Sequence, residues 1–242
     1  MEVKQVSENS QLFPLDWDSE RQEELLREQR IICGWGNNNV HLWRECARKG
    51  QRTMFWIGIP PEGELGKRIT TAQKGLGVIN FEHDGCITKY LAVGHVALDR
   101  IDVPSTDTFN PEPTLVAEDG SVLTIAALFV MPEFSRFRLG TFAVRRCEEL
   151  AQQQPYGSEN CRAVTVNSLS PRHTKGGMEG PEGMGAFDRM GLPVQENNSV
   201  PWFKKLGYVP YKEAPRYLSP TLDGTKVHLW CIYLRKDLEV KA

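Results

Sequence analysis

The strongest hydrophobic pattern in the chain lies at residues 122–131, where Thr124 is the only polar residue. The run is too short to span a membrane and too apolar for a strand with one solvated face. It therefore predicts a sheet strand that is covered on both faces. Pro132 ends the strand, because proline has no N–H to donate to a strand ladder.

A helical pattern follows this strand. Apolar residues recur at a spacing that places them near one face of a helix, and polar residues cover the opposite face. The apolar face comprises Leu139, Phe142, Ala143, Cys147, Leu150 and Ala151, and the polar face comprises Arg145, Arg146, Glu148, Glu149 and Gln152. Pro155 and Gly157 stop the helix, so the central stretch predicts a strand, a turn and a helix in that order.

The turn between this strand and this helix carries candidate chemistry. A helix N-terminus offers N–H groups without intrahelical partners and about half a positive charge, which suits a phosphate. Gly140 would let the backbone approach an anion without a Cβ in the way, and Arg136, Arg138 and Arg145 add positive charge. The alternative interpretation of the same residues is a solvated basic turn.

The remaining patterns predict two helices before the central stretch and short strands around it. The helices run from residue 18 or 19 to Gly34 and from about 39 to 49. Strands are predicted at residues 53–59, 77–81, 91–98, 162–167 and 228–234, and a short helix through residue 205 precedes a strand that begins at residue 208. Residues 215–225 are predicted as the loop of a hairpin between the last two strands.

Two long stretches are rich in glycine and proline and lack periodicity. We expect one domain over residues 1–242, with insertions at about 61–89 and 170–198. Loops this long are uncommon in compact domains unless they are functional or disordered. The second stretch is therefore either an active-site lid with little core to anchor it or a surface excursion.

Composition excludes some classes of partner. A net charge of −2, from 29 basic and 31 acidic residues, gives no reason to expect a nucleic acid or an acidic membrane surface as partner. The 6 cysteines are scattered without a C-x-x-C pair, which favours reduced thiols inside the cell, and the 5 histidines show no metal-ligand spacing. With a mean hydropathy of −0.41 and no leader pattern, we expect a soluble cytoplasmic protein without a metal.

Two stretches resemble a known family. The run LFVMPEFSRFRLGTFAV resembles the cofactor motif of the GNAT superfamily of acyl-CoA-dependent N-acyltransferases, in which an apolar strand leads to a phosphate loop of the form Gln/Arg-x-x-Gly-x-Gly/Ala. Ser135 stands where Gln or Arg is usual, and Arg138 stands where the first glycine is usual. The run WFKKLGY resembles the aromatic-Tyr-x-x-Leu-Gly-Phe step of the superfamily, and KVHLWCIYLRKDL resembles its closing strand. These motifs cover roughly the C-terminal half of the chain.

The resemblance implies a mixed α/β fold, with a central, mostly antiparallel twisted sheet that splays at the cofactor strand and helices on both faces. It implies acetyl-CoA as co-substrate, a primary amine of a small molecule or peptide as acceptor, and direct transfer of the acetyl group in a ternary complex. The cofactor-binding residues that it implies are Leu128, Phe129, Val130, Ser135, Arg136, Phe137, Arg138, Leu139, Gly140, Thr141, Asn198 and Trp202.

The general base is not evident. Members of the superfamily often place a carboxylate on the cofactor strand, but residues 125–127 of this chain contain no acid. A base could come from Asp99, from Asn167 through an ordered water, or from Asp188, and a weakly basic amine would need none.

The general acid also departs from the family pattern, because Phe203 stands where the family often has a tyrosine. The proton for the leaving thiolate could come from Tyr208, Tyr211, Tyr217 or water. We favour Tyr217, since tyrosines in this hairpin loop reach the active site in some relatives. A domain that binds acyl-CoA or a protein partner without turnover is the alternative function.

Overall fold

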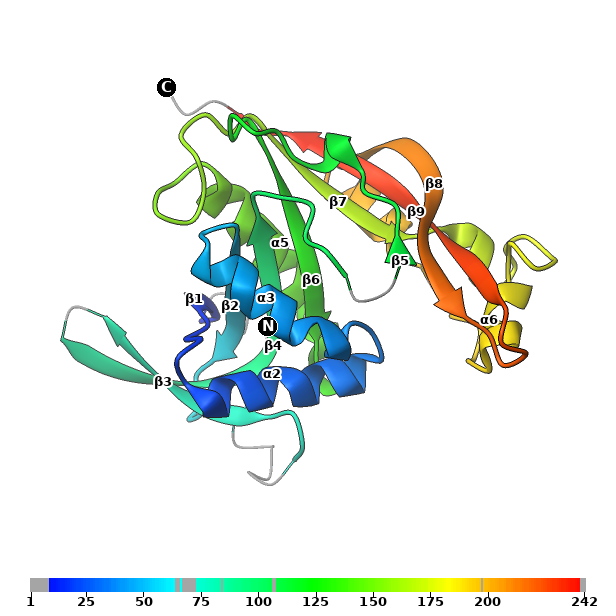
Figure 1. Cartoon of the computed structure of the whole chain (residues 1–242). Helices are drawn as coiled ribbons and strands as arrows, with labels where there is room; N and C mark the ends of the chain where they lie inside the picture. The colour runs from blue at the N-terminus through cyan, green and yellow to red at the C-terminus, as the bar shows by residue number, and fades with distance from the viewer. Residues whose placement is uncertain are drawn as a thin grey trace. The chain divides into compact units, whose positions relative to one another are not determined.

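The computed structural model describes residues 9–63, 66, 73–83, 85–105, 108–196 and 198–239 (Figure 1). The chain has a mixed α/β fold with an open, mostly antiparallel sheet. It divides into two compact units, the first comprising Met1–Asp99 and Ile125–Glu159 and the second comprising Arg100–Thr124 and Asn160–Ala242. Among the described residues, no helix is long and apolar enough to cross a membrane.

The first unit contains antiparallel strands with helices on both faces. Its strands are ordered β1, β2, β4 and β6, and β3 pairs with β4. Helices α2 and α3 lie on one face of β2 and β4, and α5 lies on the other (Figure 1). The elements are β1 (Gln11–Pro14), α2 (Glu20–Cys33), η1 (Asn37–Asn39), α3 (Val40–Arg48), β2 (Arg52–Ile59), β3 (Gly77–His83), β4 (Cys86–Asp99), the later part of β6 (Val122–Val130), η3 (Pro132–Phe137) and α5 (Leu139–Ala151).

Local sequence explains where these elements begin and end. The Ser19 hydroxyl accepts a hydrogen bond from the Gln22 N–H at 3.4 Å, and α2 ends at Gly34, whose φ of 79° suits glycine. The expected helices and strands of this unit are present, although β4 begins five residues before the predicted residue 91. The predicted insertion at 61–89 contains β3, and its residues 64–65, 67–72 and 84 lie outside the described residues.

A buried ion pair joins β2 to β4. The Arg52 guanidinium donates to both Asp99 carboxylate oxygens, at 2.7 and 2.8 Å, and the two side chains are 3% and 1% exposed. The Trp43 ring of α3 covers this pair, with the Arg52 Cζ atom 4.6 Å from the ring centre. Asp99 therefore holds the sheet together and is not exposed as a base.

The second unit contains the remaining strands. Its strands are ordered as the start of β6, then β7, β9, β8 and β5. The start of β6 pairs in parallel with β7 over Val122, Leu123 and Thr124, and the other strand pairs are antiparallel. The elements are β5 (Thr108–Phe109), η2 (Pro113–Leu115), β7 (Ala163–Leu169), η4 (Pro171–His173), α6 (Gly185–Met190), α7 (Val200–Lys205), β8 (Val209–Pro220) and β9 (Lys226–Asp237).

The last hairpin corrects the sequence prediction. Residues 215–225 were expected as a loop, but β8 continues to Pro220, and only a tight turn closed by a 3.0 Å bond from the Thr221 N–H to the Thr225 carbonyl separates it from β9. Tyr217 consequently lies in a strand, opposite Leu229. The prolines of this segment argued against a strand, because proline has no N–H to donate to a strand ladder. In the structure the pairing of β8 with β9 shifts register beside Pro210 and Pro215, so the strand continues past both residues.

The stretch at 170–198 is better anchored than its sequence predicted. Phe187 of α6 is fully buried, and the buried His173 imidazole bonds the backbone at two points. His173 Nδ1 lies 2.8 Å from the Gly183 carbonyl oxygen, and Nε2 lies 2.8 Å from the Trp230 nitrogen of β9. A carbonyl accepts and an amide donates, so Nδ1 carries the proton and the ring is neutral.

We expect acid to loosen this anchor. Burial lowers the pKa of His173 below its ordinary 6.5. The unfolded chain therefore binds the proton more tightly, so the stabilising contribution is complete above pH ~6.5 and is lost as the pH falls below it. Hydrogen exchange should show a lower protection factor at the Trp230 amide at pH 5.5 than at pH 7.5.

In His173→Ala the Trp230 amide should lose protection at both pH values, whereas replacing the exposed His228 by Gln should leave its protection unchanged. Equal protection at both pH values in the natural chain would contradict this.

Candidate functional site

The candidate phosphate-binding turn runs from the end of β6 to the first turn of α5, within the first unit. Two buried side chains fix its ends. Phe134 of η3 is 2% exposed and its N–H donates to the Met131 carbonyl at 2.8 Å, while Leu139 at the start of α5 is 0% exposed. Ser135, Arg136 and Arg138 lie between these anchors and are exposed. The turn thus presents two guanidinium groups and a hydroxyl to solvent.

The backbone of Arg138 explains why glycine is usual at this position. Its φ is 59°, a left-handed conformation that only glycine adopts without steric cost. This conformation lets the Arg138 carbonyl accept the first α5 bond, from the Phe142 N–H at 3.0 Å, while its side chain caps nothing. The N–H groups of the first turn, including those of Leu139 and Gly140, have no carbonyl four residues before them inside the helix. They are suited to an anion.

Replacing Arg138 by glycine should stabilise the fold and weaken the site. Removing the left-handed strain gives about 1 kcal/mol, partly offset by the greater entropy of the unfolded chain. Loss of the guanidinium should lower CoA affinity at the same time. Arg136→Gly is the matched control, because Arg136 lies in the 3-10 helix and its replacement removes charge without relieving strain. Thermal unfolding and calorimetry measure both quantities, and a less stable Arg138→Gly variant would count against the assigned backbone.

The end of β6, residues 126–130, is apolar and only partly covered. Residues 126–130 are each only partly buried, so the strand is not covered on both faces as its sequence predicted. Phe129 packs its ring 5.5 Å from the buried His95 ring, which leaves its backbone as the group that could meet a ligand. A Cβ on Gly94 of β4 would lie 2.3 Å from the Phe129 carbonyl oxygen, so glycine permits the close approach of β4 to β6. Ala127, with a φ of 50°, interrupts the regular strand.

The polar face of α5 differs from its prediction at one residue. Glu148 is buried, whereas Arg145 and Arg146 are exposed as expected. The predicted Phe137, Gly140 and Thr141 are partly exposed, as are Leu128 and Val130. All the predicted residues from Leu128 to Thr141 therefore lie in one unit.

Asn198 and Trp202 belong to the second unit. The Asn198 side-chain oxygen accepts from the Val200 N–H at 3.1 Å, and Asn198 lies one residue before Ser199, the N-cap of α7. Trp202 is partly exposed and its ring lies 4.7 Å from that of Phe203. Phe203, which stands where the family often has a tyrosine, is itself buried.

The three candidate tyrosines have different surroundings. Tyr208 is 2% exposed and packs on Phe203 with the ring centres 5.4 Å apart. The exposed Tyr211 accepts a 3.0 Å hydrogen bond from the Thr114 hydroxyl. Tyr217 is half-buried, and its phenol hydrogen-bonds the side chain of Asn167 on β7. Burial raises the pKa of Tyr217, so its phenol keeps its proton near neutral pH.

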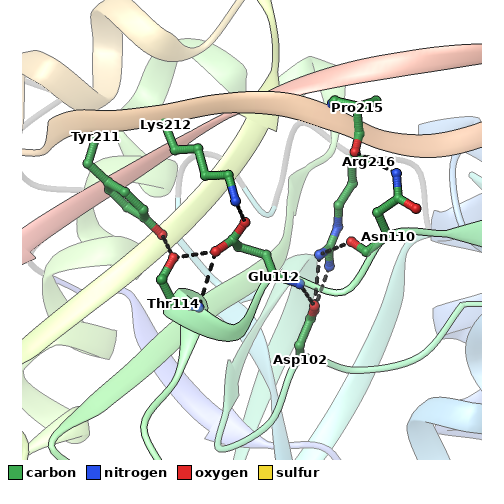
Figure 2. A network of polar contacts seen from close by, with 8 residues as sticks. All are labelled: Asp102, Asn110, Glu112, Thr114, Tyr211, Lys212, Pro215 and Arg216. Carbon is green, nitrogen blue, oxygen red and sulfur yellow. Dashed lines mark hydrogen bonds and ion pairs between the residues drawn. The ribbon is translucent and has the colours of Figure 1, made fainter.

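The segment before β6 is tied to β8 by a polar network (Figure 2). Arg216 donates to both Asp102 carboxylate oxygens, at 2.8 and 2.5 Å, and to the Asn110 carbonyl at 3.2 Å. The buried Glu112 accepts from Lys212 of β8 at 2.5 Å. Nothing in the hydrophobic pattern marks these partners, because they lie about a hundred residues apart in the chain.

The other candidate reactive groups are the cysteines, Asp188 and possible metal ligands. None of the six cysteines, all in described parts of the chain, forms a disulfide. Burial raises the pKa of Cys231 to about 12 and also raises that of Cys147, so neither is a ready thiolate. Asp188 is exposed on α6. Among the described residues, no three His, Cys, Asp or Glu side chains group as metal ligands.

Several solved structures resemble this chain. One is aminoglycoside 6'-N-acetyltransferase from Enterococcus faecium, with 12% identity, a TM-score of 0.49, and coverage of 96% of this chain and 99% of that chain. Another is Arabidopsis thaliana NAA60 in complex with acetyl-CoA, with 10% identity, a TM-score of 0.47, and coverage of 95% and 98%. The loading GNATL domain of CurA from Lyngbya majuscula has 15% identity, a TM-score of 0.46, and coverage of 94% and 97%.

Neither a family model nor a curated protein sequence matches the chain. Likenesses at this level of identity and TM-score carry nothing about substrate or activity. The function proposed below therefore rests on the residues of this chain.

Proposed function

We propose that the chain is a cytoplasmic acetyltransferase that moves an acetyl group from acetyl-CoA to a primary amine of a small molecule or peptide. The observation that carries the proposal is the order apolar strand, basic turn and helix N-terminus, with a left-handed residue at the start of α5. Two independent motifs of the sequence support it.

The turn and the end of β6 that precedes it fit the two ends of CoA. The first-turn amides of α5 and the exposed guanidinium groups of Arg136 and Arg138 would hold the pyrophosphate. The partly buried end of β6 would contact the pantetheine arm through the backbone of Leu128, Phe129 and Val130. Ser135, Phe137 and Thr141 complete this proposed surface in the first unit. Asn198 and Trp202, in the second unit, remain proposed CoA-binding residues on the sequence resemblance alone.

Acetyl-CoA supplies an acetyl group that its thioester activates. In the proposed reaction the amine nitrogen bonds to the acetyl carbon while the carbon–sulfur bond breaks. The nitrogen then releases one proton to solvent to give the neutral amide, and the leaving thiolate takes a proton. We assign that proton to the Tyr217 phenol, which solvent then reprotonates. An alkyl amine of pKa ~10.4 must first lose its own proton, at a cost of roughly 4.6 kcal/mol at pH 7. Asn167, through an ordered water, and the exposed Asp188 remain as proposed routes, because Asp99 is paired with Arg52.

The alternative is a domain that binds acyl-CoA or a protein partner without turnover. The absence of an acid at residues 125–127 and the buried Phe203 favour it. Release of CoA thiol, measured with the purified chain, acetyl-CoA and a panel of small amines and peptides, separates the two. Thiol release that depends on an amine supports the transferase. Calorimetric binding of acetyl-CoA without amine-dependent release supports the alternative, and absence of both removes the CoA site.

A further inference from the structure

Arg216 occupies an unusual position in the second unit. It lies at the register shift of β8 between Pro215 and Tyr217, and its side chain is only 5% exposed. Its guanidinium meets Asp102, which is 14% exposed, through two hydrogen bonds (Figure 2). A hydrophobic pair of similar volume often stabilises a fold as well as a buried ion pair does, so stability alone does not explain this one.

The cation is placed beside a buried group of phenol and thiol side chains. The Arg216 Cζ atom lies 5.6 Å from the centre of the Tyr217 ring. Tyr217 and Cys231 both hydrogen-bond the side chain of Asn167, and Leu115 packs in the same cluster. Burial raises the pKa of Tyr217 and the charge of Arg216 acts in the opposite direction. Arg216 is thus a positive charge, beside the Tyr217 ring, that favours loss of the phenolic proton.

We propose that Arg216, held in place by Asp102, is a positioning residue that enables Tyr217 to donate its proton in the acetyl transfer. This inference rests on the proposed function. When Tyr217 gives its proton to the leaving thiolate, negative charge develops on the phenol oxygen. A preorganised cation and the Asn167 side chain stabilise that charge without reorganisation of solvent. Asp102 acts one step further away, because it fixes the orientation of the guanidinium.

A double-mutant cycle tests this role. Tyr217→Phe should lower kcat by at least ~10²-fold, the lower figure for general acid catalysis. Arg216→Met should lower kcat by roughly 10- to 100-fold with little change in the KM for acetyl-CoA. In the Tyr217→Phe background, Arg216→Met should have almost no further effect, because the charge then has no phenol on which to act. Arg216→Lys should recover part of the rate.

Two further variants keep the test independent of folding. Asp102→Asn keeps the Arg216 charge but removes its countercharge, so it should also lower the free energy of unfolding. Thermal unfolding therefore gives the folded fraction at the assay temperature, and kcat per folded chain should fall several-fold only where Tyr217 is present. Arg235→Met, which removes an exposed arginine of β9, should leave kcat unchanged in either background. If the effects of Arg216→Met and Tyr217→Phe on kcat were additive, the positioning role would be overturned. The proposed function would still stand, provided that the wild-type chain shows amine-dependent thiol release. A wild-type chain without amine-dependent thiol release would overturn both.

Discussion

Gly140→Glu should abolish binding of acetyl-CoA while leaving the chain folded. The new carboxylate would enter the place where the proposed pyrophosphate meets the first turn of α5, and it would repel the same anion. Charge-assisted hydrogen bonds contribute about 1.5–3 kcal/mol each. The loss of two amide contacts therefore predicts a dissociation constant ~10²- to 10⁴-fold larger in calorimetry. A glutamate in the first turn of a helix is otherwise favourable, because it complements the helix dipole and replaces a flexible glycine.

The stability of this variant separates binding from folding. Thermal unfolding should show Gly140→Glu at least as stable as the natural chain, whereas CoA binding disappears. Gly140→Gln is the matched control, since it adds the same bulk without the charge and should retain more affinity. If folded Gly140→Glu bound acetyl-CoA as tightly as the natural chain, the phosphate site would lie elsewhere.

Asp99→Asn should lower the free energy of unfolding by about 3–5 kcal/mol. The substitution leaves the Arg52 guanidinium, which is 3% exposed, without a countercharge in the core of the first unit. Breaking a buried pair from one side carries a cost of this size, because the remaining charge stays desolvated. Urea unfolding measures the change.

Two companion variants show whether charge is the cause. The double variant Arg52→Met with Asp99→Leu should recover most of the lost stability, since no buried charge remains. Asp18→Asn removes one partner of the exposed pair with Arg48, at 3.5 Å, and should change stability by no more than ~1 kcal/mol. If the double variant were as unstable as Asp99→Asn, lost packing and not an uncompensated charge would explain the effect.

Much of the fold could be predicted because local patterns decide it. The helices α2, α3 and α5 lie where apolar spacing, an N-cap serine and terminal glycines place them. The exposed basic turn before α5 was also predictable, since its residues are consecutive in the chain, whereas its role in phosphate binding stays a prediction. The length of β8 was not, because Pro210 and Pro215 break the local strand pattern and only pairing with β9 shows that register shifts absorb them.

The sequence by itself determined the order of the longer strands and helices, although not β1, β5 or α6. It also determined the basic turn before α5 and the arginine at the position where glycine is usual. The tertiary structure decided that the backbone of this arginine is in the left-handed region and that Asp99 forms an ion pair with Arg52. It also decided that Tyr217 lies in a strand. It also paired Arg216 with Asp102, 114 residues away. The physical reason is the range of the interactions: spacing and capping act within a few residues, whereas the partner of a buried polar group comes from any part of the chain and leaves no periodic trace.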